Sequence, residues 1–274
     1  MQPQTWVSHS SISEYLRCPR AYFLKNVYKD PKTGRKINII NPALALGNVV
    51  HEVLESLAPL RVEERFKEPL LPLFNKAWIK IKGEAGGFTN EQEEMEFKNR
   101  GEMMIQRVLD NPGPLLNKAV KLHSPDMLPP RFFLSEKENI ILCGKVDWIE
   151  YIPEDDSVHI IDFKTGMNEE NPNSLQLPIY SLLVKNCQKR NVKKISYWYL
   201  ETDNSPKEMP MPDLDIAEKS VLKIALQIKQ LRSIGAYKCA TTGGCFACRP
   251  LEAIVEGKAK FIRTSDYQDI YALL

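Results

Sequence analysis

The sequence has no excess of charge of either sign, no long apolar run and no internal repeat. Its 37 Lys and Arg residues are balanced by 35 Asp and Glu residues, so any basic surface for nucleic acid must be local. No window approaches the roughly 18 uninterrupted apolar residues of a membrane-spanning helix. The first residues show no basic start followed by an apolar run, as a secretory signal would. We therefore expect a cytoplasmic protein.

A nucleotide-binding P-loop of the form G-x-x-x-x-G-K-[ST] is also missing. If the protein acts on duplex DNA, unwinding must come from a partner chain such as a helicase. The 274 residues, 43% of them apolar, suffice for a real hydrophobic core in one large domain or two modest ones.

The order of the expected elements indicates the fold class. Helices are expected over residues 8–28 (with a bend or the beginning of a second helix at Pro19), 44–57, 61–110 (broken near Gly86 and Gly87), 175–187 and 215–234. β-Structure is expected over residues 131–163 and 194–201. Helices first, then a β-meander, then helix and strand predict an α/β fold with a mixed central sheet.

The most informative stretch runs from Cys143 to Lys164. We expect Asp147 on one strand, and Asp162 and Lys164 two residues apart on another. Because side chains alternate along a strand, Asp162 and Lys164 project from the same face. Two carboxylates and an ammonium at the end of a short hairpin form a site for a hard divalent cation and a phosphate.

An isolated Asp-x-Lys on a strand is also compatible with a surface salt bridge, but three further features favour a site. His51, in the helical segment GNVVHEVLE, offers an imidazole ligand, which favours Mn²⁺ over Mg²⁺, although a single histidine of this kind is more often a core or surface residue than a ligand. Gln176 and Tyr180 are four residues apart and share one helix face. Thr165 and Gly166 end the lysine strand with small residues that let a phosphate backbone approach.

In this order the motifs resemble those of the PD-(D/E)XK nuclease superfamily, in its RecB-like exonuclease branch. That branch carries G-x-x-x-H on a helix, G-x-x-D on a strand, D-x-K followed by T-G on a second strand, and Q-x-x-x-Y on a helix. This chain has, in the same order, Gly47 and His51, Gly144 and Asp147, Asp162 with Lys164, Thr165 and Gly166, and Gln176 with Tyr180. The resemblance extends from about Ser10 to Cys248, with Asp162 where many relatives have Glu.

The resemblance implies a restriction-endonuclease-like core, an α/β fold whose mixed central β-sheet is flanked by helices. It implies a single nuclease domain over residues 1–274. Its parts would be a mainly helical region (1–130) with His51, a catalytic sheet core (131–200), and a C-terminal helix with a cysteine-rich segment (201–274).

The resemblance also implies a role for each motif residue. His51, Asp147 and Asp162 would bind Mg²⁺ or Mn²⁺, with the backbone carbonyl of Phe163 as an additional ligand. The other catalytic residues would be Lys164, Gln176 and Tyr180. Lys164 would position or activate the attacking water, and Gln176 and Tyr180 would orient the lysine and the DNA backbone.

The function implied is a metal-dependent DNA nuclease, an exonuclease of single-stranded or end-processed DNA in repair, recombination, or CRISPR or phage DNA metabolism. The alternative is a non-catalytic subunit that binds DNA ends within a recombination complex. A basic run after the Gln176–Tyr180 helix reads either as a solvated face or as phosphate contacts beside the site; it comprises Lys185, Lys189, Arg190, Lys193 and Lys194.

Three cysteines lie close together as C-x5-C-x2-C, namely Cys239, Cys245 and Cys248, and Cys18 lies far upstream. In a reducing compartment cysteines are thiols or metal ligands rather than disulfides. Four thiolates hold either tetrahedral zinc or a [4Fe–4S] cluster, and the alternative is a set of unligated buried thiols.

RecB-like nucleases, including AddB-type subunits and the Cas nucleases of spacer acquisition, often clip one N-terminal cysteine to three near the C-terminus around an iron–sulfur cluster. The resemblance therefore implies a [4Fe–4S] cluster on Cys18 and the C-terminal trio, with zinc as the alternative. In those relatives C-x2-C comes first in the trio, whereas here the longer gap comes first. The other two cysteines, Cys143 and Cys187, are expected to be packing residues.

Overall fold

A mixed four-stranded sheet lies at the centre of the computed structural model, which describes residues 4–122, 126, 128–265 and 267–273. Its strands follow the order β5-β6-β7-β8, with β6 and β7 parallel and the other neighbours antiparallel. The four strands are β5 (Trp148–Ile152), β6 (Ser157–Lys164), β7 (Val192–Tyr199) and β8 (Lys207–Met209). The predicted α/β fold with a mixed sheet is confirmed.

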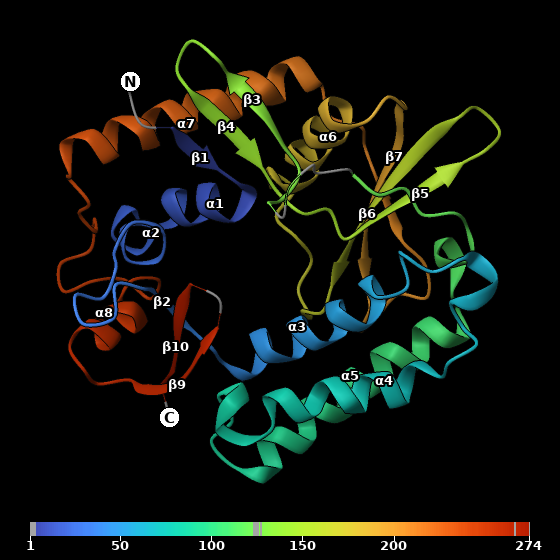
Figure 1. Ribbon diagram of the computed structural model, residues 1–274, viewed down its shortest axis with the longest axis horizontal. Helices are drawn as coiled ribbons and strands as arrows, with labels where there is room; N and C mark the ends of the chain where they lie inside the picture. Colours follow the sequence, from blue (N-terminus) through green and yellow to red (C-terminus); the bar gives the residue numbers. More distant parts are fainter. Residues whose placement is uncertain (1–3, 123–125, 127, 266, 274) are drawn as a thin grey trace.

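The central sheet is buried on both faces, and side-chain alternation along β6 separates two hydrophobic cores. Ile161 and Phe163 point into one core, whereas Val158 and Ile160 point into the other. The first core is covered by α3 (Pro42–Glu55), α4 (Leu70–Trp78) and α5 (Glu91–Asp110), and the second by α6 (Gln176–Cys187) and α7 (Leu214–Ile234). Figure 1 shows these two helical layers on opposite sides of the sheet.

Side-chain caps explain where several helices begin. Asn41 accepts a hydrogen bond from the Leu44 N–H at the start of α3, and Asp213 caps α7 in the same way. Gly235 ends α7 in the left-handed conformation, with φ of 67°. The bend expected at Pro19 is confirmed, because Cys18 ends α1 (His9–Arg17) and its side chain caps α2 (Pro19–Asn26).

Two smaller sheets connect distant parts of the chain. One has the order β1-β4-β3, formed by β1 (Thr5–Val7), β4 (Ile140–Cys143) and β3 (Arg131–Ser135). The other has the order β2-β10-β9, formed by β2 (Lys36–Ile39), β10 (Gln268–Ala272) and β9 (Lys260–Ser265). Because β10 pairs in parallel with β2, the C-terminal segment lies beside the N-terminal region, next to the short helix α8 (Arg249–Val255) (Figure 1).

Most expected elements are present. The break expected near Gly86 and Gly87 is confirmed, because the segment 61–110 holds two α-helices, α4 and α5, joined by short 3₁₀ turns with Gly87 in the left-handed conformation, although α4 begins only at Leu70. The strands β1, β2, β8, β9 and β10 and the helix α8 were not predicted, since each is short, and β1 and β2 also find their partner strands far along the chain. Among the described residues, no helix combines the length and apolar character needed to cross a membrane.

Candidate active site

The carboxyl end of β6 brings the Asp-x-Lys motif against the first turn of α6. Lys164 Nζ lies 2.9 Å from Asp162 Oδ2 and donates a 2.5 Å hydrogen bond to Gln176 Oε1. The Gln176 amide donates to Asp162 Oδ1 at 2.6 Å and contacts the Tyr180 hydroxyl at 3.2 Å. Gln176 therefore bridges the acid and the lysine, and Tyr180 lies on the same helix face as expected.

Asp162 is the most deeply buried acid of this group, with 2% of its surface exposed. Burial, strengthened by the charge of Asp147 and opposed by that of Lys164, raises the pKa of Asp162 to about 7. Its Oδ2 forms an ion pair with the Lys164 ammonium at 2.9 Å. A buried carboxylate beside a second acid is costly, and a coordinated divalent cation would lower that cost.

Asp147 lies in the bend directly before β5, not on the strand as predicted. The antiparallel pairing of β5 with β6 brings it beside Phe163, whose backbone N–H donates to Asp147 Oδ2 at 2.9 Å. That hydrogen bond gives the backbone N–H at the end of β6 a partner and holds the Asp147 carboxylate in place. The Phe163 ring is buried in the core, 6.1 Å from the His51 ring.

His51 reaches this cluster from the middle of α3. Its Nδ1 lies 3.5 Å from Asp147 Oδ2 and 3.6 Å from Glu55 Oε1. Burial alone would lower the pKa of His51, but hydrogen bonds to Asp147 and Glu55 outweigh it and raise that pKa to about 10. The two acids create a strongly negative environment, which suits a bound cation.

Glycines of the motifs have a packing role. A Cβ on Gly47 would lie 3.2 Å from Thr165 Oγ1, and a Cβ on Gly144 would lie 2.9 Å from Leu183 Cδ1. The missing side chains therefore let α3 approach the loop after β6, and let the segment before Asp147 approach α6.

Three residues near the site were missed by sequence reasoning. Glu55 lies one helical turn after His51, a spacing that could have revealed it. Glu170 lies in the loop after β6, with its Oε2 3.0 Å from Lys164 Nζ, and no periodic pattern marks it. His9, at the start of α1, has its pKa lowered to about 4 by burial and then by the charge of Lys164.

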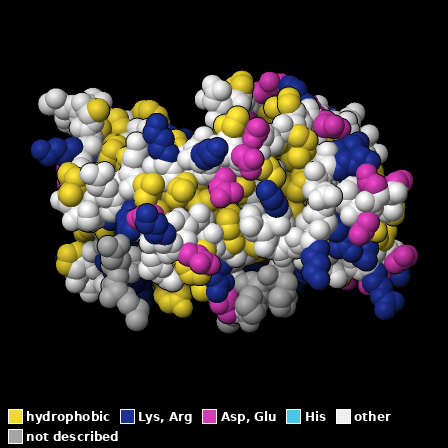
Figure 2. All heavy atoms as spheres, turned by 90° about the horizontal axis from the view of Figure 1, so that it is seen from above, with side chains coloured by type: hydrophobic (Ala, Val, Ile, Leu, Met, Phe, Trp, Pro, Cys, Tyr) yellow, Lys and Arg dark blue, Asp and Glu magenta, His cyan; other side chains and the backbone are white. Residues whose placement is uncertain are grey.

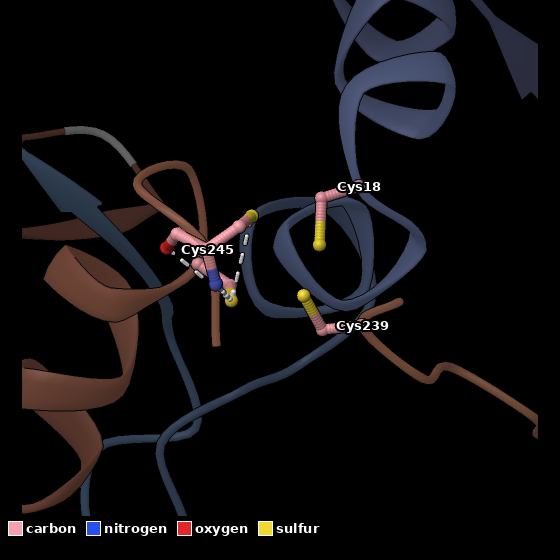
Figure 3. A group of neighbouring side chains, drawn as sticks. Cys18, Cys239 and Cys245 are labelled. Carbon is pink, nitrogen blue, oxygen red and sulfur yellow. Dashed lines mark hydrogen bonds between the residues drawn. The ribbon is translucent and has the colours of Figure 1, made fainter. Parts of the chain in front are cut away.

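The four predicted cysteine ligands come together from both ends of the chain. The sulfurs of Cys18, Cys239, Cys245 and Cys248 all lie within 4.8 Å of one another. Figure 3 shows the sulfurs of Cys18 and Cys239 pointing toward each other, from the N-terminal helices and the C-terminal segment respectively. The salt bridge between Arg20 and Glu252, with a shortest distance of 2.5 Å, holds α2 against α8 beside the cluster.

The surroundings of these sulfurs differ in how far they favour the thiolate form. Backbone N–H groups of Cys248 and Ala247 lower the pKa of Cys245 to about 6, whereas burial raises that of Cys248 to about 12. Gly244 has φ of 86°, and a Cβ there would lie 3.2 Å from Cys248 Sγ, so glycine leaves room for the sulfur. Cys143 and Cys187 lie outside the cluster, with their thiols near backbone carbonyls.

The basic run after α6 is largely neutralised. Arg190 pairs with Asp156 at 2.7 Å, Lys193 with Asp155 at 2.5 Å, and Lys194 with Glu208 at 3.6 Å. On the face shown in Figure 2, Lys and Arg side chains are scattered among Asp and Glu side chains. These pairs favour a solvated face over a dedicated phosphate-binding patch.

Comparison with protein families supports the interpretation of the motifs. The family model of the PD-(D/E)XK nuclease superfamily matches residues 6–253. The chain belongs to the PD-(D/E)XK nuclease superfamily. Membership implies metal-dependent hydrolysis of phosphodiester bonds in nucleic acid. A search of curated proteins gives no match.

Proposed function

We propose that this PD-(D/E)XK protein is a Mg²⁺- or Mn²⁺-dependent deoxyribonuclease of the RecB-like branch, an exonuclease acting on single-stranded or end-processed DNA. The observation that carries the proposal is the state of Asp162. Its carboxylate is buried, its Oδ1 accepts a hydrogen bond from Gln176, and its Oδ2 forms an ion pair with Lys164 at 2.9 Å. The charge of Asp147 acts on the same carboxylate, so two acids meet beside one lysine, and this arrangement suits a divalent cation rather than a simple salt bridge.

Each residue of the cluster has a role in this proposal. Asp162, Asp147 and His51 hold the cation, with the carbonyl of Phe163 as a further ligand. The cation supplies charge neutralisation at the phosphate and a water of lowered pKa. Lys164, fixed by its bond to Gln176, positions that water by donating a hydrogen bond, and its ammonium stabilises developing negative charge. Tyr180 anchors Gln176 from the next helical turn.

We also propose that the four cysteines hold a metal that clips the first helices to the C-terminal segment. Thiolates about 2.3 Å from one zinc ion lie about 3.8 Å apart in a tetrahedron, and Cys245 Sγ and Cys248 Sγ are 3.8 Å apart. A [4Fe–4S] cluster holds its thiolates further apart, so the sulfurs would have to spread to accept it. Analysis of iron, sulfide and zinc in protein purified without oxygen decides between the two, and metal-free, fully stable protein contradicts both.

The test of activity is a cleavage assay on end-labelled single-stranded and duplex DNA with Mg²⁺ or Mn²⁺. Wild type is expected to shorten the labelled strand, and Lys164→Ala to bind DNA without cleaving it. Lys207→Ala is a matched control, because Lys207 is half exposed and pairs with Glu169 on the neighbouring loop. DNA binding by wild type without cleavage under either metal would instead support a non-catalytic subunit that binds DNA ends.

The wider role belongs to the same proposal. Such an exonuclease would serve repair, recombination, or CRISPR or phage DNA metabolism, with a helicase or another protein of these pathways supplying opened strands. Cleavage of duplex DNA that rises sharply when a helicase is added would support this partnership. Equal cleavage of blunt duplex with and without a helicase would count against it.

A further inference from the structure

A group of three metal-ligating side chains extends the site beyond the motif residues. His51, Glu55 and Asp147 each offer one ligand atom, and these atoms lie within 4.8 Å of one another. The side chains are 27%, 18% and 10% exposed, respectively. An imidazole nitrogen and carboxylate oxygens are suitable ligands for Mn²⁺. The motifs account for His51 and Asp147, and leave Glu55 without a role.

The group opens on a hollow of about 600 Å³, lined by Asn48, His51, Glu52, Glu55, Ser56 and Lys145. This space admits a hydrated ion and a phosphate group. The buried Asp162 is close enough for its charge to act on His51. Glu55 thus faces the same cation position from the side of the hollow.

Glu55 is already paired with a cation of the protein itself. Its Oε2 forms an ion pair with Lys145 Nζ, and Lys145 lies in the bend two residues before Asp147. The Lys145 side chain is 69% exposed, whereas that of Glu55 is 18% exposed. The ammonium therefore reaches into the cluster from solvent, and a metal ion that takes the Glu55 carboxylate competes with it.

We propose that Glu55 is a further ligand of the divalent cation, and that Lys145 holds its carboxylate until the cation binds. The inference rests on the proposed nuclease function and deepens it. When Glu55 turns to the cation, Lys145 is released at the edge of the hollow, where its ammonium can pair with a phosphate of the DNA strand. Cation binding frees Lys145 to pair with a phosphate, and DNA binding frees Glu55 to bind the cation. Cation binding and DNA binding therefore favour each other.

The experiment measures Mn²⁺ affinity by calorimetry on metal-free protein without DNA. Glu55→Gln should weaken Mn²⁺ binding by about tenfold or more, as loss of a ligand does. Lys145→Met should strengthen it by about threefold, because a competing charge is gone. Glu102→Gln and Lys98→Met are the matched controls. They carry the same charge changes in an ion pair of 3.4 Å on α5, outside the lining of the hollow, and should shift the affinity by less than about twofold.

Opposite shifts from the two ends of one ion pair cannot arise from a loss of folding, and thermal unfolding of each variant checks this directly. Equal affinities for Glu55→Gln and Glu102→Gln would overturn the ligand assignment. Unchanged or weaker binding by Lys145→Met would overturn the competition. Asp147→Asn separates the inference from the proposed function. If Asp147→Asn binds Mn²⁺ like wild type, the proposed metal centre itself is wrong. If Asp147→Asn loses Mn²⁺ binding while Glu55→Gln binds normally, only the role of Glu55 is wrong.

Discussion

Strand β6 carries two buried polar clusters, on opposite faces, and they differ in the number of acids that they bring together. Toward its start, His159 Nδ1 lies 2.8 Å from Glu150 Oε2, and His159 Nε2 lies 2.7 Å from Ser196 Oγ. The other oxygen of Glu150, the acid of this cluster, accepts a hydrogen bond from Asn117. Toward its end, Asp162 pairs with Lys164 at 2.9 Å, and the charge of a second acid, Asp147, raises the pKa of Asp162.

The difference separates a structural network from a binding site. The His159 cluster links β5, β6 and β7 side by side, and each of its named groups has a partner, as buried polar groups do when they stabilise a fold. The Asp162 cluster brings two acids together beside one lysine, an arrangement that suits the proposed cation. A glutamate–histidine–serine chain would resemble a hydrolase triad by distance alone, but Ser196 is 1% exposed and so has no access to a substrate.

Breaking the Asp162 cluster should have the largest effect, on the rate of DNA cleavage. Lys164→Met should lower the rate of DNA cleavage by about 10²–10⁴-fold, because the donor at the developing charge is lost. Single-turnover cleavage with saturating protein measures this. If Lys164→Met retains at least half of the wild-type rate while the inert control Lys207→Met behaves as wild type, the lysine has no catalytic role.

Breaking the His159 cluster should lower the stability of the fold. Glu150→Leu leaves His159 buried without its carboxylate and should lower the free energy of unfolding by about 3 kcal/mol. Cleavage per folded molecule should stay at the wild-type level. Urea unfolding, with activity corrected for the folded fraction, gives both numbers, and a fall in corrected activity would show that the two clusters are coupled.

The stability that the His159 cluster contributes should depend on pH. Burial alone would raise the pKa of Glu150, but hydrogen bonds from His159 and Asn117 outweigh it and lower that pKa. A lowered pKa of an acid contributes stability above the unfolded value, and this stability is lost as the pH falls through the folded value. Wild type should therefore lose more stability than Glu150→Gln when urea unfolding is repeated between pH 6 and pH 3. Parallel losses would contradict this role of Glu150.

Asp162→Asn should show the opposite sign in metal-free protein. The pKa of Asp162 is raised to about 7, so folding favours its protonated form, and stability falls as the pH rises from about 4 through 7. The neutral amide should remove this fall. At pH 8 the free energy of unfolding of the variant should exceed that of wild type by at least about 1 kcal/mol. Thermal unfolding with a chelator present tests it, and a variant less stable than wild type would make Asp162 a structural residue.

The smallest expected effect comes from Ser196→Ala. It removes one partner of His159 and should cost about 1 kcal/mol of stability without changing cleavage. A much larger loss of activity than of stability would contradict the structural interpretation of the His159 network. Urea unfolding and single-turnover cleavage measured on the same preparation compare the two losses.

Local patterns in the sequence predicted most of the central architecture. The period of the apolar residues predicted α3, α6 and α7, and alternation predicted that Asp162 and Lys164 share a face of β6. The strands β1, β2 and β10 were missed because three to five residues carry little periodicity, and their partners lie far along the chain. Asp147 was placed on a strand, since spacing does not show where backbone pairing begins.

By itself, the sequence determined which residue types are available in order along the chain: an acid, a lysine two residues after another acid, and a helix face with Gln176 and Tyr180. Only the tertiary structure decided which groups meet. Burial and ion pairing depend on neighbours from other elements, so Asp162 met a second acid, Asp147, whereas Glu150 met His159 and Asn117. For the same reason Glu55 and Lys145, ninety positions apart, became partners at the proposed cation site only when α3 packed beside the segment before β5.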